Sequence, residues 1–301
     1  MTAIRFDGRT ALVTGAGGSL GRAFAIDLAA RGAAVFVNDL GCDGRGEGAD
    51  PASADAVVEE IRGMGGEAHA DYRSVVDGEA IVGRILDERG RLDVIVHSAG
   101  ILRDSSFHKM TREDWDRILD VHLLGVSAIN KAAWPGMRDR SYGRIVMITS
   151  AAGLFGNFGQ VNYAAAKMAL VGMGQSLAQE GEKRNIKVNL AAPVAGSRLV
   201  RSVLSQELCD ALKPEYVAPL VTLLSSEACP VNGAVFEVGA GVVSRVQWLR
   251  SKGVAFRIPE SFDAERVMEA WDAINDMRDA TITTSFAQST QRTLGNLRRS
   301  E

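Results

Sequence analysis

Tyr163 and Lys167 are the residues of this chain whose types and spacing best fit catalysis. They lie four residues apart in the segment YAAAK, within a helical pattern, so both side chains are expected on one helix face. An unperturbed tyrosine has a pKa of about 10, which is too high for a base at neutral pH. A neighbouring ammonium group stabilises a phenolate, so we expect Lys167 to lower the pKa of Tyr163 and allow it to exchange protons.

Ser150 is the third candidate catalytic residue. It directly follows the apolar run Arg144–Thr149 and stands thirteen residues before Tyr163. Ligands bind at the carboxyl ends of parallel strands, where a serine hydroxyl can donate a hydrogen bond to a substrate oxygen that gains negative charge. A tyrosine–lysine pair alone could be an ordinary helical pair. Together with Ser150 and an upstream glycine loop, the pair predicts hydride transfer at a hydroxyl or keto carbon.

The glycine loop is the segment TGAGGSLG at 14–21, which follows the apolar run Thr10–Thr14 and opens a helical pattern. Glycine lets the backbone turn sharply and approach a pyrophosphate, and the helix N-terminus offers unpaired N–H groups to it. A plain connecting turn is the alternative, but the position after the first expected strand favours a dinucleotide. The predicted cofactor contacts in this loop are Gly15, Ser19, Leu20 and Gly21.

Asp39 ends the second expected strand, 24 residues after Gly15. A carboxylate there can accept hydrogen bonds from the adenosine ribose and would repel the 2′-phosphate of NADP. Leu40 and Gly41 supply no cation to offset that repulsion, so NAD is the predicted cofactor. The alternative is a solvated aspartate that caps the strand end.

Apolar strand-like runs alternate with helical patterns over the first 240 residues. The expected strands are Thr10–Thr14, Ala34–Asp39, Glu67–Asp71, Asp93–His97, Arg144–Thr149, Lys187–Ala191 and Ala234–Val238. The expected helices lie near 20–31, 51–64, 76–89, 111–138, 161–184 and 214–226. This order predicts an α/β fold, a Rossmann-type doubly wound parallel sheet. We expect one domain, with the dinucleotide and catalytic sites in 1–240 and a C-terminal extension, 241–301, packed on it.

Two further segments of the chain have a predicted form. Gly41–Gly48 has four glycines in eight residues and is expected to be a mobile loop. The extension is expected to contain a helix near 263–276.

Composition restricts the partners of the chain. Of its 301 residues 46% are hydrophobic and 24% charged, which suits a globular core. A net charge of −3 provides no strong field for nucleic acid or an anionic membrane. We find no signal-like start and no long apolar run, and the three cysteines are scattered, which predicts a cytoplasmic location. The four histidines lack metal-ligand spacing, so we expect no metal.

The chain resembles the short-chain dehydrogenase/reductase superfamily. The motifs that carry the resemblance are TGAGGSLGR (14–22), SAG (98–100), Ser150, YAAAK (163–167) and NLAAP (189–193). More narrowly, it is similar to the (3R)-hydroxyacyl-CoA dehydrogenase domains of peroxisomal multifunctional enzymes of type 2, which are 17-beta-hydroxysteroid dehydrogenase type 4-like. That similarity rests on VNDLGCDGRGEG (37–48), AGILRD (99–104), VHLLG (121–125), the segment 142–167 and FEVGAG (236–241). It runs from about residue 4 to residue 290.

The resemblance implies an NAD-dependent enzyme that converts (3R)-3-hydroxyacyl-CoA to 3-oxoacyl-CoA, with a fatty-acyl or steroid side chain. A hydroxysteroid dehydrogenase or a 3-oxoacyl thioester reductase is the alternative. A non-enzymatic NAD-binding sensor would not need the serine, tyrosine and lysine. The resemblance also implies a homodimer or homotetramer formed through helices 111–138 and 161–184. The ending RRSE lacks a peroxisomal SKL signal, which again favours the cytoplasm.

Family positions extend the predicted cofactor site. The resemblance assigns cofactor contacts to Ser74, Val75, Ser98, Tyr163, Lys167, Ala195 and Ser197. Three positions depart from the family pattern: Ser19 replaces a glycine, His97-Ser98 replaces Asn-Asn, and His122 stands where the superfamily usually has a catalytic asparagine. His122 could be structural or could transfer protons.

Two sets of residues are weighed for substrate binding. Cations that could meet the phosphates of coenzyme A, or simply be solvated, are Arg103, Arg198, Arg201 and Lys213. Side chains that could line an acyl pocket, or instead form core or subunit contacts, are Leu154, Phe155, Phe158 and Val161.

Overall fold

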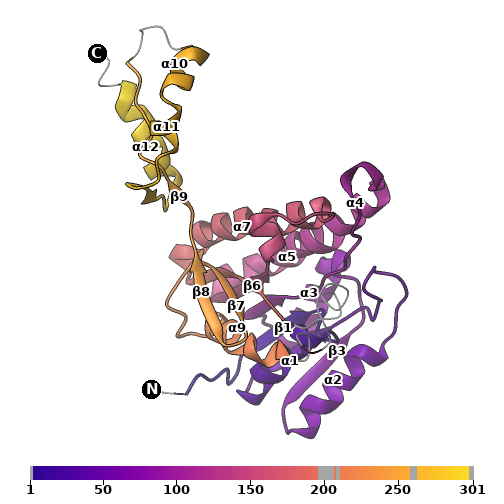
Figure 1. Ribbon diagram of the computed structural model, residues 1–301. Coiled ribbons are helices and arrows are strands. Elements are labelled where there is room, and N and C mark those ends of the chain that lie inside the picture. The colour runs from indigo at the N-terminus through magenta and orange to yellow at the C-terminus, as the bar shows by residue number, and fades with distance from the viewer. Residues whose placement is uncertain (1–2, 196–206, 208–210, 258–262, 298–301) are drawn as a thin grey trace. The chain divides into compact units, whose positions relative to one another are not determined.

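The computed structural model describes residues 3–195, 207, 211–257 and 263–297. The chain forms two compact units, Met1–Arg245 and Val246–Glu301 (Figure 1). The first unit contains the predicted α/β fold.

Within the described residues, the first unit is built on an eight-stranded sheet in the order β3-β2-β1-β4-β5-β6-β7-β8. The strands are β1 (Thr10–Thr14), β2 (Ala34–Asn38), β3 (Glu67–Asp71), β4 (Val94–His97), β5 (Gly143–Ile148), β6 (Ile186–Pro193), β7 (Val235–Gly239) and β8 (Val242–Val246). Every pairing from β3 through to β7 is parallel. The order reverses beside β1, where the chain crosses from β3 to β4, and such a switch point opens a crevice at the carboxyl ends of the strands.

Helices cover both faces of this sheet, as predicted. They are α1 (Ser19–Ala30), α2 (Ala52–Gly63), α3 (Gly78–Arg89), α4 (Arg112–Leu119), α5 (Gly125–Arg140), α6 (Ala151–Phe155), α7 (Val161–Gly181) and α9 (Ala218–Ser225). Helix α1 packs against α2 and α9, whereas α3 packs against α5, and the two groups lie on opposite sides of the sheet (Figure 1).

The segment predicted as one helix over 111–138 is divided. Helix α4 ends at Leu119, a π-helical turn covers Asp120–Leu124, and α5 follows directly. A π turn rotates the residues after it relative to an unbroken α-helix, and such turns are frequent at functional sites. His122 lies in this turn and is buried.

The core explains why the strands are apolar runs. All residues of β1, β2, β4 and β5 are buried, because helices cover both faces of a parallel sheet. The predicted strands therefore agree with the observed ones to within a residue or two at each end.

The second unit is small. It contains the antiparallel pair β9 (Leu249–Arg250) and β10 (Thr281–Ile282) with helices α10 (Ala264–Glu269), α11 (Trp271–Asn275) and α12 (Phe286–Leu297). The helix predicted near 263–276 is thus present as two helices. No described residue of this unit is buried. Packing of this extension on the first unit stays a prediction.

Two searches of the described residues bear on function. No helix there combines the length and apolarity needed to cross a membrane. No cluster of three or more His, Cys, Asp or Glu side chains there could hold a metal ion.

Candidate active site

The loop between β1 and α1 packs so tightly that it requires glycine at two positions. Gly15 has φ +64°, and a Cβ on it would lie 2.6 Å from the Cα of Ala99. A Cβ on Gly21 would lie 2.3 Å from the carbonyl oxygen of Gly15. No side chain caps α1 at Gly18, so the first N–H groups of this helix are available to an anion.

Asp39 lies where β2 ends and already holds two loops together. Its Oδ2 accepts a hydrogen bond from the N–H of Gly17 at 2.8 Å, and its Oδ1 accepts one from the N–H of Gly41 at 2.7 Å. An ionised carboxylate has about four acceptor positions, so two remain for ribose hydroxyls. The residue therefore fits its predicted role and has an additional structural one.

A cleft opens at the carboxyl edge of β1, β2 and β4. Eight predicted cofactor contacts line it: Gly15, Ser19, Leu20, Gly21, Asp39, Ser74, Val75 and Ser98. The hydroxyl of Thr14 accepts hydrogen bonds from the N–H groups of Ser98 and Ala99, both at 3.2 Å. These bonds hold the loop after β4, which also lines the cleft, against the end of β1. The backbone donors of the glycine loop and a carboxylate with two remaining acceptor positions fit a nicotinamide dinucleotide.

The other predicted cofactor contacts do not line this cleft. Ala195 is buried, with 4% of its surface exposed, and Tyr163 and Lys167 lie beyond the lining residues. Ser197, like Arg198 and Arg201, lies outside the described residues.

Ser150, Tyr163 and Lys167 come together beside the end of β5. Ser150 begins α6, where its Oγ accepts a hydrogen bond from the N–H of Ala152 at 3.1 Å, and it lies near enough to the side chain of Tyr163 to act on the pKa of that group. Lys167 Nζ donates to the carbonyl oxygen of Ile148 at 2.7 Å and lies 5.6 Å from the centre of the Tyr163 ring. Three residues separated in sequence thus form one polar cluster.

Burial dominates the electrostatics of this cluster. It raises the pKa of Tyr163 to about 12, while the hydrogen bond from Ser150 acts in the opposite direction. Burial also lowers the pKa of Lys167 to about 7. The expected lowering of the Tyr163 pKa is not observed, because removal of water disfavours the charged form of both groups.

His122 packs edge-on against Tyr163, with 5.1 Å between the ring centres. Its Nε2 lies 3.1 Å from the nitrogen and 2.9 Å from the oxygen of the Ile101 backbone. Burial lowers the pKa of His122 well below its usual range, so the ring is neutral. These contacts give His122 a structural role, and a part in proton transfer stays untested.

His97, the second departure from the family pattern, is also buried and neutral. Its Nε2 lies 2.8 Å from Oδ1 of Asn130 on α5. Burial lowers its pKa to about 4. The loop after β4 is held instead by the hydroxyl of Thr14.

Sequence reasoning missed Asn162, which orients the first turn of α7. Its side-chain oxygen accepts a hydrogen bond from the N–H of Tyr163 at 2.8 Å, and its Nδ2 lies 3.3 Å from the carbonyl oxygen of Arg103 and 3.2 Å from that of Asp114. A polar side chain in the first turn of a helix is a signal of such backbone bonding.

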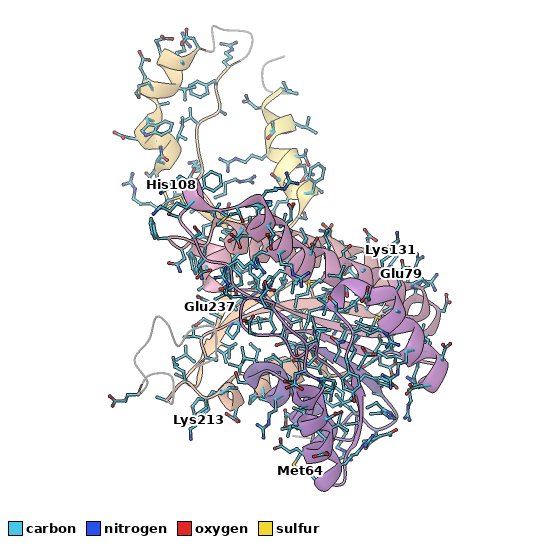
Figure 2. All side chains as sticks on the ribbon, turned by 90° about the vertical axis from the view of Figure 1, so that its right-hand side faces the viewer. Met64, Glu79, His108, Lys131, Lys213 and Glu237 are labelled. Atoms are coloured by element: carbon cyan, nitrogen blue, oxygen red, sulfur yellow. The ribbon has the colours of Figure 1, made fainter. Side chains whose placement is uncertain are left out.

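The residues weighed for substrate binding differ in exposure. Arg103 is 7% exposed and forms ion pairs with Glu47, Glu113 and Asp114, so it does not project toward a coenzyme. Lys213 is exposed and projects from the surface (Figure 2). Among the apolar residues, Leu154 belongs to the core, whereas Phe155, Phe158 and Val161 are exposed.

The fold and the site define a nicotinamide-dependent oxidoreductase. Residues 9–206 match the short chain dehydrogenase family, and the chain belongs to that family. This agrees with the similarity seen in the sequence.

Several proteins of known name are similar in sequence to this chain. The chain is 50% identical to mouse peroxisomal multifunctional enzyme type 2 over 95% of its own length, but spans only 39% of that protein. It is 49% identical to a short-chain type dehydrogenase/reductase of Mycobacterium tuberculosis, covering 91% of this chain and 96% of that one. An acetoacetyl-CoA reductase of Rhizobium meliloti is 36% identical over 77% of this chain and 98% of its own.

Solved structures of related proteins have the same fold as this chain. Full-length peroxisomal multifunctional enzyme type 2 from Drosophila melanogaster superimposes with a TM-score of 0.84 at 38% identity, over 98% of this chain and 50% of that one. A 7 alpha-hydroxysteroid dehydrogenase complexed with NADH and 7-oxo glycochenodeoxycholic acid superimposes with a TM-score of 0.70 at 28% identity, over 79% and 95%.

The predicted cytoplasmic location is wrong. Five relatives that are 44–50% identical to this chain are named peroxisomal enzymes. Their names point to the peroxisome instead, and the scattered cysteines and the ending RRSE were weak guides.

Proposed function

We propose that this chain uses NAD to oxidise (3R)-3-hydroxyacyl-CoA to 3-oxoacyl-CoA. The observation that carries the proposal is the cluster in which Ser150 lies near enough to Tyr163 to act on its pKa and Lys167 Nζ lies 5.6 Å from the centre of the tyrosine ring. The name of one relative supports the substrate class, because acetoacetyl-CoA, which an acetoacetyl-CoA reductase acts on, is a 3-oxoacyl thioester of coenzyme A.

In the proposed reaction each of the three residues has a separate task. Ser150 donates a hydrogen bond to the substrate oxygen as its charge changes. Tyr163 takes the hydroxyl proton while hydride leaves the same carbon, and returns a proton in the reverse direction. When bound, NAD accepts the hydride and contributes a positively charged nicotinamide ring. Lys167 Nζ lies 5.6 Å from the centre of the tyrosine ring, where its ammonium form would stabilise the phenolate.

The preference for NAD over NADP rests on Asp39. Its charge would repel a 2′-phosphate. Arg73 also lines the cleft, but its guanidinium is paired with Asp71. We therefore expect NAD to bind more tightly than NADP.

The test is a panel of substrates with purified protein and either NAD or NADP. We expect NADH to form with (3R)-3-hydroxyacyl-CoA, slower reaction with the 3S epimer, and no reaction with Tyr163→Phe. Absence of turnover across short, medium and long acyl chains would overturn the proposed substrate.

A hydroxysteroid is the second candidate substrate. The likeness to the 7 alpha-hydroxysteroid dehydrogenase supports it, as do the exposed apolar residues Phe155, Phe158 and Val161, which follow Ser150 closely in sequence. Comparison of kcat/KM for a free hydroxysteroid and for an acyl-CoA separates the candidates. A larger value for the steroid would favour the second.

We also propose that the chain associates as a homodimer or homotetramer. Helix α7 has no charged residue between Lys167 and Glu180, yet Ala165, Gly172 and Ser176 on it are exposed. A helix that is apolar over most of its surface is normally covered, and a second copy of α7 is a suitable cover. Light scattering coupled to size exclusion measures the mass, and a monomer would contradict this proposal.

For the extension we propose packing on the dehydrogenase unit. Exposed Trp271, Phe286 and Leu297 leave the second unit without a core of its own, so burial elsewhere would stabilise it. Limited proteolysis that removes the extension rapidly from the native protein would argue against this.

A further inference from the structure

The loop that was predicted to be mobile is instead fastened across the cofactor cleft. We refer to residues Asp43–Glu47 as the strap. Within it, Oδ1 of Asp43 accepts hydrogen bonds from the N–H groups of Arg45 and Glu47 at 2.8 and 2.9 Å. The strap also contributes Asp43, Gly44 and Gly46 to the lining of the cleft.

The strap is held to the opposite wall of the cleft by several contacts. The N–H of Leu102 donates to the carbonyl oxygen of Gly44 at 2.8 Å. Arg103 Nε donates to the carbonyl oxygen of Arg45 at 3.0 Å, and its guanidinium forms an ion pair with Glu47. Arg117, on α4, donates to the carbonyl oxygen of Gly46 at 3.3 Å.

Arg103 is the central member of this connection. Its side chain is 7% exposed, whereas the Glu47 carboxylate is 65% exposed. Glu113 and Asp114 on α4 bind the same guanidinium, each at 3.3 Å. The arginine is therefore fixed on the α4 side whatever the strap does, and only Glu47 and the Arg45 carbonyl depend on strap closure.

The flanks of the strap allow it to move as a unit. Gly41 and Gly48, on either side of the strap, have positive φ at +74° and +82°, and so does Gly46 within it, at +86°. Such positions favour glycine, and glycine tolerates large changes of backbone angle. Hinges of opening loops often consist of a few such residues.

We propose that the strap is a clasp over the bound dinucleotide, and that Arg103, as a positioning residue, sets the rate at which cofactor is released through its pairing with Glu47. The inference rests on the nicotinamide cofactor of the proposed function, and holds for NADH or NADPH. The strap must open for a molecule lying in the cleft to leave, and opening breaks the Arg103–Glu47 pair.

The test compares two glutamates that bind the same arginine. Glu47→Gln removes the charge on the strap, and Glu113→Gln removes a matched charge on α4 that is 81% exposed. We expect Glu47→Gln to speed NADH dissociation about tenfold, as the loss of one charged hydrogen bond would. Glu113→Gln is expected to stay within about twofold of wild type. Stopped-flow fluorescence of bound NADH, or of NADPH where that binds better, gives the rate constants.

Hydrogen exchange supplies a readout that needs no cofactor. We expect the amides of the strap and of Leu102 to exchange about tenfold faster in Glu47→Gln, and not in Glu113→Gln. Equal release and exchange rates in both variants and wild type would overturn the clasp. So would equal acceleration in both variants, which would indicate a general charge effect. Turnover of hydroxyacyl-CoA is not used, so failure of the substrate proposal leaves this result unaffected.

Discussion

The cofactor side and the catalytic side of the sheet edge are organised by different forces. On the cofactor side, glycines and backbone N–H groups shape the cleft, and Asp39 joins two loops through hydrogen bonds to Gly17 and Gly41. On the catalytic side, Tyr163 is half-buried and Lys167 is buried, and the loss of water moves the pKa of each group in the direction that favours its neutral form. The backbone therefore fixes the shape of the cofactor cleft, whereas the protonation states of Tyr163 and Lys167 depend on the water and the charged groups around them.

Substitutions can test whether the two sides are separable. A change on the catalytic side should alter turnover and leave cofactor affinity intact. A change on the cofactor side should do the reverse. Mixed effects would show that the sides act as one unit.

The largest expected effect is that of Tyr163→Phe. Loss of the hydroxyl removes the proton acceptor, so kcat should fall about 10³-fold, within the range for acid–base groups. NADH affinity, measured by fluorescence titration, should change by less than about twofold because Tyr163 does not line the cleft. A loss of NADH affinity as large as the loss of kcat would show that the catalytic and cofactor sides are not separable.

Ser150→Ala should have the next largest effect. The variant loses the hydrogen bond to the substrate oxygen, and kcat should fall about 10²-fold. It also loses the cap on α6, at a cost of about 1 kcal/mol in stability. Ser150→Thr, which keeps a hydroxyl, is the matched control and should recover part of the rate. Failure of threonine to recover any activity, with the fold intact, would point to a steric role.

Lys167→Met tests the cost of the buried amine. The pKa of Lys167 falls from 10.5 to about 7 on folding, so between these values the unfolded chain binds more protons and stability rises with pH. Below pH 7 the full cost of the buried charge is present. At pH 6 the variant should exceed wild type by about 2 kcal/mol in the free energy of unfolding, and this excess should shrink by pH 10.

Urea unfolding at pH 6 and pH 10 measures that difference. Lys131→Met, at an exposed lysine on α5 (Figure 2), is the control, and no pH-dependent difference is expected for it. A constant difference between Lys167→Met and wild type at both pH values would contradict the buried-charge explanation.

The smallest expected effect is on the cofactor side. Asp39→Asn should weaken NAD binding about tenfold and strengthen NADP binding, because the charge that selects between them is gone. Its kcat at saturating cofactor should stay within about threefold of wild type. Asp55→Asn, at a half-buried position on α2 that does not line the cleft, is the control. Unchanged NAD affinity in Asp39→Asn would contradict the ribose assignment.

The sequence by itself determined the strands and the glycine loop, and it singled out Ser150, Tyr163 and Lys167 as candidate catalytic side chains. A strand that is buried on both faces, such as β1 or β4, is a continuous apolar run and can be recognised from its composition. Eight of the twelve predicted cofactor contacts line the cleft. Those of the glycine loop and Asp39 follow from strand ends, whereas Ser74, Val75 and Ser98 were implied by the family resemblance. The local sequence pattern was sufficient to predict a residue of the cleft wherever that residue directly follows a strand.

Only the tertiary structure decided how the strap lies, how Asn162 and Arg103 are used, and which way the pKa of Tyr163 moves. The strap is glycine-rich and was read as mobile, but its contacts come from residues more than fifty positions away, such as Arg103. The pKa depends on how much water burial removes, and neighbours four residues apart do not fix that. Contacts between segments far apart in the sequence determine both the position of the strap and the pKa of Tyr163. A local pattern of residues cannot predict such contacts.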